Sequence, residues 1–156
     1  MQRAEQTIRV AAGPETVYRF WRDFQNFPRF MDHVDEVRLL DSEGQLSHWK
    51  LKGPAGVKLE FDARLTRDEP DRQIAWNSTE GSMQTSGTVT FTPIESDYGY
   101  TEVHVIMQWY DVPGGAVGEA LSKLLQNPQE MLQEDLQRFK HLVETQVGAT
   151  ARSANR

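Results

Sequence analysis

The C-terminal part of the chain carries large apolar residues at intervals of three and four positions, the spacing that places side chains on one face of an α-helix. Charged residues between them, such as Lys123, Glu134 and Lys140, fall mostly away from that face. The pattern predicts a long helix over residues 115–147. A helix with such a stripe needs an apolar partner to be stable in water, so we expect it to cover a sheet. The stripe consists of Val117, Leu121, Leu124, Leu132, Leu136, Phe139 and Val143.

The middle of the chain alternates apolar and polar residues with a period of two, which is typical of strands that have one face buried. Gly, Pro and Asp separate these strands, and such short links join antiparallel neighbours. No βαβ pattern appears, so we expect an antiparallel sheet and an α+β fold. Seven strands are predicted, over residues 5–11, 34–40, 46–52, 57–67, 73–78, 84–92 and 101–110.

Two short helical segments follow the first strand, and both are strongly aromatic. The first begins near Pro14, a residue that suits a first helical turn, and the second contains Phe30 and Met31. A break is also predicted inside the long helix, where Asn127, Pro128 and Glu130 form a new helix start. We interpret residues 1–147 as a single domain and residues 148–156, which are small and polar, as a disordered tail.

Composition narrows the classes of function. The chain has 156 residues, a formal charge of −6 and no cysteine, which argues against nucleic-acid binding and excludes disulfides and zinc–thiolate sites. No apolar run is long enough to span a membrane, and the N-terminus lacks a signal peptide. We therefore expect a cytoplasmic protein without a cofactor, as a monomer or weak homodimer.

Several short segments resemble the bacterial polyketide cyclase/dehydrase and lipid-transport family, part of the START-like or Bet v 1-like (SRPBCC) superfamily. The resemblance covers about residues 4–147. It implies a helix-grip fold, in which a curved seven-stranded antiparallel sheet wraps around a long C-terminal helix, with a deep cavity for a hydrophobic molecule. The segments are residues 26–31 followed by Val34 and Val37, then 74–76, 86–91, 101–103, 113–115 with Gly118, and 134–140.

Large apolar residues on the helix-facing side of the strands are the candidates for lining such a cavity, together with those on the helix stripe. Burial of a ligand among them would supply the affinity. The alternative is a filled core, in which the same residues only pack against one another. The candidate lining residues are Trp49, Phe61, Trp76, Phe91, Met107, Trp109, Leu121, Leu124, Leu132 and Leu136.

The aromatic residues of the two short helices are candidates for a portal, with Met31 as an adaptable contact. They are Phe24, Phe27, Phe30 and Met31. The alternative is a small core that anchors these helices to the sheet.

No catalytic motif matches this chain residue by residue, and whether it is an enzyme stays open. Histidines form no metal-binding pattern, and His33 with Asp35 is interpreted as a solvated strand edge. Gly114 to Gly118 lacks the features of a P-loop or a dinucleotide fingerprint. Catalytic candidates are Tyr18, Tyr110, Asp111 and Arg64, if they point inward, and strand alternation directs Arg64 outward.

These observations leave three alternative functions. The first is the binding of a hydrophobic small molecule, such as a lipid, a polyketide or a quinone-like compound. The second is an enzyme of the polyketide cyclase, aromatase or dehydratase type, which needs an ionisable residue with a shifted pKa in the cavity. The third is a partner-docking domain, for which an exposed apolar patch over Phe24, Phe27 and Phe30 would be the evidence.

Overall fold

A computed structural model describes residues 2–97, 99–110 and 114–154 of the chain. Its strands are β1 (Gln2–Val10), β2 (Val34–Leu39), β3 (Leu46–Lys52), β4 (Lys58–Glu69), β5 (Gln73–Gly81), β6 (Thr85–Pro93) and β7 (Thr101–Trp109). Its α-helices are α1 (Pro14–Arg22), α2 (Gly115–Leu124) and α3 (Pro128–Ala154), and two short 3-10 helices are η1 (Phe24–Arg29) and η2 (Pro54–Gly56).

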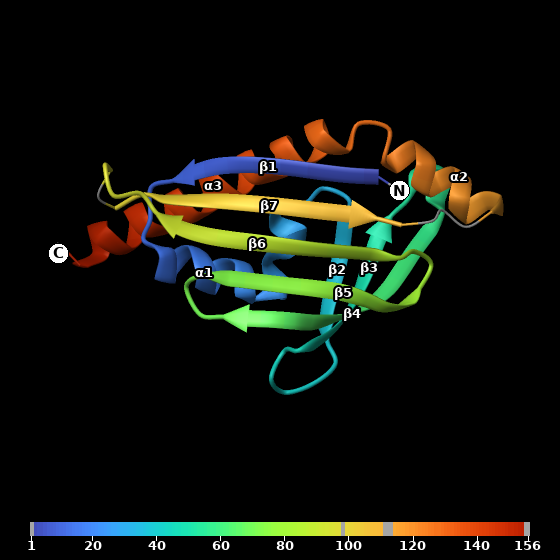
Figure 1. Ribbon diagram of the computed structural model, residues 1–156, viewed down its shortest axis with the longest axis horizontal. Helices are drawn as coiled ribbons and strands as arrows, with labels where there is room; N and C mark the ends of the chain where they lie inside the picture. Colours follow the sequence, from blue (N-terminus) through green and yellow to red (C-terminus); the bar gives the residue numbers. More distant parts are fainter. Residues whose placement is uncertain (1, 98, 111–113, 155–156) are drawn as a thin grey trace.

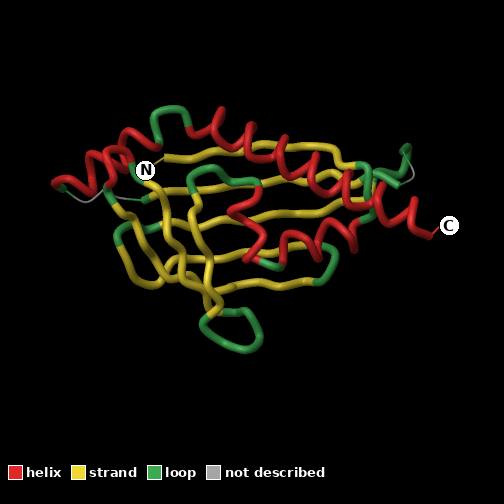
Figure 2. The backbone as a smooth tube through the Cα atoms, turned by 180° about the vertical axis from the view of Figure 1, so that it is seen from behind, coloured by secondary structure: helices red, strands yellow, loops and turns green. Residues whose placement is uncertain are grey.

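The seven strands form one antiparallel sheet in the order β1-β7-β6-β5-β4-β3-β2. The sheet curls, so β2 and β3 cross at a steep angle to the strands of the opposite edge (Figure 1). Figure 2 shows α3 running along the other face of the sheet, with α1 beside it. The predicted α+β helix-grip fold is confirmed.

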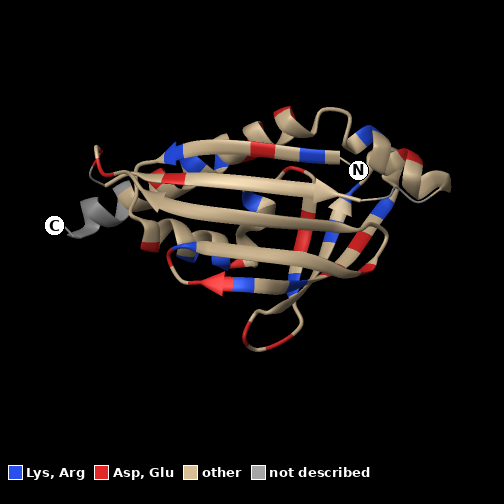
Figure 3. Ribbon diagram, viewed as in Figure 1, with Lys and Arg blue, Asp and Glu red and all other residues tan. Residues whose placement is uncertain are grey.

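Strand alternation places the side chains as the sequence predicts. In β4, Leu59, Phe61 and Ala63 are buried, whereas Arg64 is exposed on the outer face. In β7, Val103, Val105 and Trp109 are likewise buried. Figure 3 shows few charged residues along β6 and β7. In β6, Ser86, Thr88 and Thr90 alternate with buried positions.

The predicted break in the C-terminal helix is confirmed, since the chain leaves the helical path after Leu124 and resumes it at Pro128. The last bonded turn of α2 ends where the Leu125 amide donates to the Leu121 carbonyl, at 3.0 Å. The backbone of α3 stays helical as far as Ala154, beyond the boundary at residue 147 suggested by the sequence. That the segment from 148 is disordered in solution stays a prediction.

The centre of the core is an aromatic cluster beneath α1 and η1. The ring centroid of Trp21 lies 5.2 Å from that of Phe27 and 5.2 Å from that of Phe139, and Phe30 lies 5.1 Å from Phe139. Edge-to-face pairs of this kind contribute about 0.5–1.5 kcal/mol each beyond their burial. The cluster joins α1 and η1 to α3, and so holds the helices in place over the sheet. Within the described ranges, no helix is long and apolar enough to cross a membrane.

Candidate functional site

A cavity lies between the sheet and the helices, at the end of the molecule where α2 meets α3. We call it the chamber. Its volume is about 60 Å³. Three tryptophans, two phenylalanines and four methionines contribute to its wall. The lining residues are Phe27, Met31, His33, Val34, Trp49, Leu51, Phe61, Trp76, Met83, Thr85, Met107, Trp109, Leu124, Leu125, Leu132, Met131 and Asp135.

Most of the predicted lining residues meet at this chamber. Trp49, Phe61, Trp76, Met107, Trp109, Leu124 and Leu132 contribute to its wall. Phe91, Leu121 and Leu136 are buried elsewhere in the core and do not line it. Phe91 shows the reason, because its ring packs against Tyr18 at 6.0 Å and Trp21 at 6.5 Å, under α1. Strand alternation identifies which residues face inward, but α1 fills the space at that end of the sheet.

The four residues considered as a portal are all buried. Phe27 and Met31 line the chamber, whereas Phe24 and Phe30 pack within the aromatic cluster. The relative exposures of Phe24, Phe27 and Phe30 are 4%, 1% and 0%. The exposed patch that partner docking would need is therefore absent at these residues.

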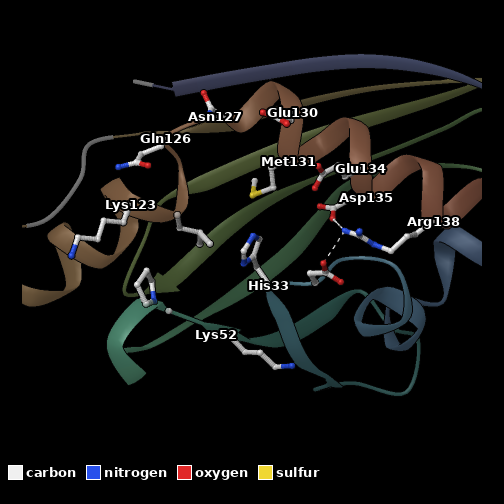
Figure 4. Close-up of a pocket in the computed structure, with 14 residues that line it drawn as sticks. His33, Lys52, Lys123, Gln126, Asn127, Glu130, Met131, Glu134, Asp135 and Arg138 are labelled. Atoms are coloured by element: carbon white, nitrogen blue, oxygen red, sulfur yellow. Dashed lines mark hydrogen bonds and ion pairs between the residues drawn. The ribbon is translucent and has the colours of Figure 1, made fainter.

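A polar groove lies outside the chamber, between α3, the α2–α3 joint and the start of β2. We call it the vestibule. Its volume is about 520 Å³, and Figure 4 shows its side chains. His33, Leu124, Met131 and Asp135 line both spaces and thus separate them. The other vestibule residues are Asp32, Lys52, Gly53, Pro54, Lys123, Gln126, Asn127, Glu130, Glu134 and Arg138.

Asp135 is the buried ionisable group at this boundary. Its relative exposure is 5%, and burial raises the pKa of its carboxyl to about 7, although the nearby Arg138 guanidinium acts in the opposite direction. Arg138 Nη2 donates to Asp135 Oδ1 at 2.5 Å and lies 3.4 Å from Asp32 Oδ2. Its Nε donates to the Phe30 carbonyl at 2.9 Å. Arg138 therefore ties α3 to the segment that follows η1.

Sequence reasoning missed Asp135, although a signal for it exists. It stands three residues after Leu132 and four before Phe139, on the apolar stripe of the helix. A carboxylate on such a stripe is rarely fully buried without a charged or hydrogen-bonding partner or a functional role. The helical spacing itself could have identified this residue.

The position of His33 differs from the one that the sequence suggested. The pattern suggests a solvated strand edge shared with Asp35, but His33 lies in the turn before β2 and lines both the chamber and the vestibule. Burial lowers the pKa of its imidazole. A pKa below the usual value near 6.5 keeps the ring neutral at neutral pH.

Three of the four catalytic candidates from the sequence lie within the described residues, and none of these three lines the chamber. Tyr18 donates its hydroxyl to Asp68, and burial raises its pKa to about 12. Tyr110 is 36% exposed and shares a hydrogen bond of 2.8 Å with the Ser86 hydroxyl. Arg64 points outward, and Asp111 lies outside the described residues. Among the described residues, no group of His, Asp or Glu side chains is arranged to hold a metal ion.

A second surface groove, of about 560 Å³, lies at the turn between β5 and β6. It shares Met83 and Thr85 with the chamber. The Thr85 hydroxyl donates to the Gln108 carbonyl at 2.7 Å, which holds this side chain in place. The chamber thus lies between two grooves, and the wall toward this one is Met83 and Thr85.

Comparison with known proteins assigns the family. A family model described as polyketide cyclase / dehydrase and lipid transport matches residues 10–137. An uncharacterized 17.2 kDa protein of Streptomyces lincolnensis, from the melC2-rnhH intergenic region, is 32% identical over 144 residues, covering 92% of this chain and 91% of that protein.

Two solved structures share the fold. DR_A0006 from Deinococcus radiodurans is 29% identical with a TM-score of 0.74, covering 93% of this chain and 98% of its own. The ZhuI aromatase/cyclase from Streptomyces sp. R1128 is 18% identical with a TM-score of 0.70, covering 94% and 95% respectively. The chain belongs to the polyketide cyclase/dehydrase and lipid transport family, as the START-like pattern of its sequence indicated.

Proposed function

We propose that this protein binds a hydrophobic small molecule, such as a lipid, a polyketide or a quinone-like compound, in the chamber. The observation that carries the proposal is a wall of aromatic, aliphatic and methionine side chains next to a polar vestibule. Removal of apolar ligand surface from water contributes about 25 cal/mol per Å². The family supports the same function at the level of fold.

The chamber must expand to hold such a ligand. Its volume of about 60 Å³ is well below the roughly 300–1,000 Å³ of most ligand pockets. Leu124 and Met131 stand on either side of the α2–α3 joint and separate the chamber from the vestibule. Methionine side chains adapt their shape at low cost. In our proposal these two residues move apart as the ligand enters.

Native mass spectrometry of the freshly purified protein, followed by solvent extraction, tests the proposal. We expect a co-purifying hydrophobic molecule, or a thermal shift with members of a hydrophobic panel. Met107→Trp, which fills the chamber, should reduce loading, whereas Ile106→Trp places the same bulk on the other face of β7 and should not. A ligand-free mass together with no thermal shift would exclude the proposal.

A second candidate function is an enzyme of the cyclase, aromatase or dehydratase type. One observation favours it, namely that Asp135 lines the chamber with a pKa raised to about 7, suited to proton transfer near neutral pH. The fold is shared with the ZhuI aromatase/cyclase. Incubation with polyketide-like chains, with product analysis, distinguishes the two functions. Turnover that Asp135→Asn abolishes while ligand binding persists would establish the enzyme, and binding without turnover would support the carrier.

A further inference from the structure

The charge on the chamber wall has one sign. Among the described residues that line the chamber, Asp135 is the carboxylate, and neither lysine nor arginine is present. His33 is the other titratable group on this wall, and the lowered pKa of its imidazole leaves it uncharged at neutral pH. A ligand in the chamber thus meets a potential negative charge and no positive one.

Arg138 does not cancel this charge completely. It lies on the vestibule side and interacts with the Phe30 carbonyl, Asp135 and Asp32. One guanidinium therefore faces two carboxylates. The exposed Glu134, which is on α3 like Arg138, adds a third carboxylate to the vestibule. Lysines occupy other walls of the vestibule, with Lys52 at the end of β3, 3.7 Å from Asp35, and Lys123 on α2 (Figure 4).

The aromatic wall complements a cation as well. The rings of Trp49, Phe61, Trp76 and Trp109 border the same small volume as Asp135. Trp49 and Phe61 are stacked, with centroids 5.7 Å apart and an interplanar angle of 11°. Ring faces attract cations, most strongly where water is excluded. A buried carboxylate beside several aromatic rings is an environment that an organic ammonium group can enter without leaving its charge unpaired.

We propose that the chamber selects hydrophobic amines, that is, molecules with a protonated amine on an apolar or aromatic body, over hydrophobic carboxylates. This inference rests on the proposed ligand-binding function. The ammonium group lies against Asp135 at the boundary with the vestibule, and the apolar body lies among Trp49, Trp76 and Trp109. An anionic end at the same place meets Asp135, whereas no lysine or arginine of the described residues lines the chamber to pair with it.

Calorimetric titration of the wild-type protein with three matched probes tests the inference at about pH 8, where Asp135 is ionised. The probes are naphthylmethylamine, naphthylmethanol and naphthoic acid, which share one ring system and differ in charge. We expect the amine to bind about tenfold or more tightly than the acid, with the alcohol between them. An alcohol or acid that binds as tightly as the amine would overturn the inference while supporting the ligand-binding function. Failure of all three probes would overturn the inference, and the native mass and the thermal-shift panel decide the ligand-binding function separately.

A matched pair of variants locates the selectivity. Asp135→Asn keeps the size of the side chain and one acceptor oxygen for Arg138 but removes the charge, so the preference for the amine should disappear. Glu119→Gln removes a carboxylate from an exposed position on α2 that lines neither the chamber nor the vestibule, and should keep the preference. Retention of the full preference in a folded Asp135→Asn protein would contradict the assignment of Asp135. The wild-type comparison of the three probes stands even if that variant does not fold.

Discussion

At the scale of single residues, two opposing interactions determine the ionisation of the Asp135 carboxyl in the chamber wall. Burial disfavours its charged form, while Arg138 at 2.5 Å favours it. The balance leaves the pKa of Asp135 at about 7 in the folded protein, against about 3.9 in an unfolded chain. The folded state therefore binds this proton more tightly than the unfolded state does.

The raised pKa predicts a pH dependence of stability. Asp135 imposes no penalty below about pH 4, and its penalty grows as the pH rises to about 7, because the unfolded chain releases this proton in that interval while the buried carboxyl keeps it. In Asp135→Asn this dependence disappears. We expect the variant to gain on the order of 4 kcal/mol in unfolding free energy relative to wild type across that interval, and nothing further above it. Urea denaturation at a series of pH values measures the gain, and parallel profiles for the two proteins would contradict the prediction.

A second prediction at the scale of one residue concerns Gly87 on β6, which leaves room for the indole of Trp76. A Cβ at this position would lie 2.1 Å from Cζ2 of Trp76, the residue paired with it on β5. Gly87→Ala must therefore displace the indole, at a cost of roughly 1–3 kcal/mol, and the chamber beside Trp76 is the space available. We expect lower stability in urea together with weaker binding of hydrophobic probes. Gly13→Ala is the control, since a Cβ at that position would have no atom within 4 Å, and equal stability losses in both variants would argue against a role for the Trp76 contact.

At the scale of elements, the position of α3 depends on a few polar ties at its two sides. Lys140 donates to the Arg9 carbonyl of β1 at 2.7 Å, and Arg138 donates to the Phe30 carbonyl after η1 at 2.9 Å. The first tie holds α3 against the edge of the sheet. The second holds it against the segment that borders both the vestibule and the chamber. Opening of the chamber toward the vestibule thus involves the second tie.

Loss of Arg138 should loosen that segment. Arg138→Gln leaves the Asp135 carboxyl buried without its cation, which costs roughly 1–3 kcal/mol where Asp135 is ionised. Amides of residues 30–34 should exchange hydrogen faster. The double variant with Asp135→Asn should lose less stability than the sum of the two single variants, because the unpaired charge is gone. Lys140→Gln, which breaks the other tie, should leave exchange at residues 30–34 unchanged, and an additive double variant would refute the coupling.

At the scale of the whole molecule, a curled sheet and a broken C-terminal helix border a small chamber. Its wall toward the vestibule includes Met131 from α3 and Leu124 from α2, so the break between these helices coincides with the boundary of the chamber. A break in a helix supplies residues that can change backbone conformation without disrupting the regular turns on either side. The break therefore suits a joint at which the chamber opens.

Truncation of Met131 should speed ligand entry. Met131→Ala removes part of the wall between vestibule and chamber, and since this side chain is only partly buried we expect a stability loss of about 1–2 kcal/mol. The association rate of naphthylmethanol, followed by stopped-flow tryptophan fluorescence, should rise severalfold. Met83→Ala opens the wall toward the groove at the β5–β6 turn and is the matched control. Faster entry in Met83→Ala alone would place the route at that groove instead.

Much of this architecture follows from the sequence, because it depends on local periodicity. The period of two in β4 and β7 determined which side chains point inward, and the helical stripe from Val117 to Val143 determined which face of the C-terminal helix is buried. Asn127 and Pro128 marked the break between α2 and α3. These features follow from backbone geometry that neighbouring residues specify by themselves.

The site itself was decided by the tertiary structure. The space between side chains depends on the curvature of the sheet and on side-chain volumes from elements far apart in the chain, so Trp76 borders the chamber while Phe91 packs under α1. The raised pKa of Asp135 results from burial, and its partners Arg138 and Asp32 come from α3 and from the turn before β2. Sequence periodicity could place Asp135 on the buried face of the helix, but only the packing of α3 against the sheet directs it to a cavity.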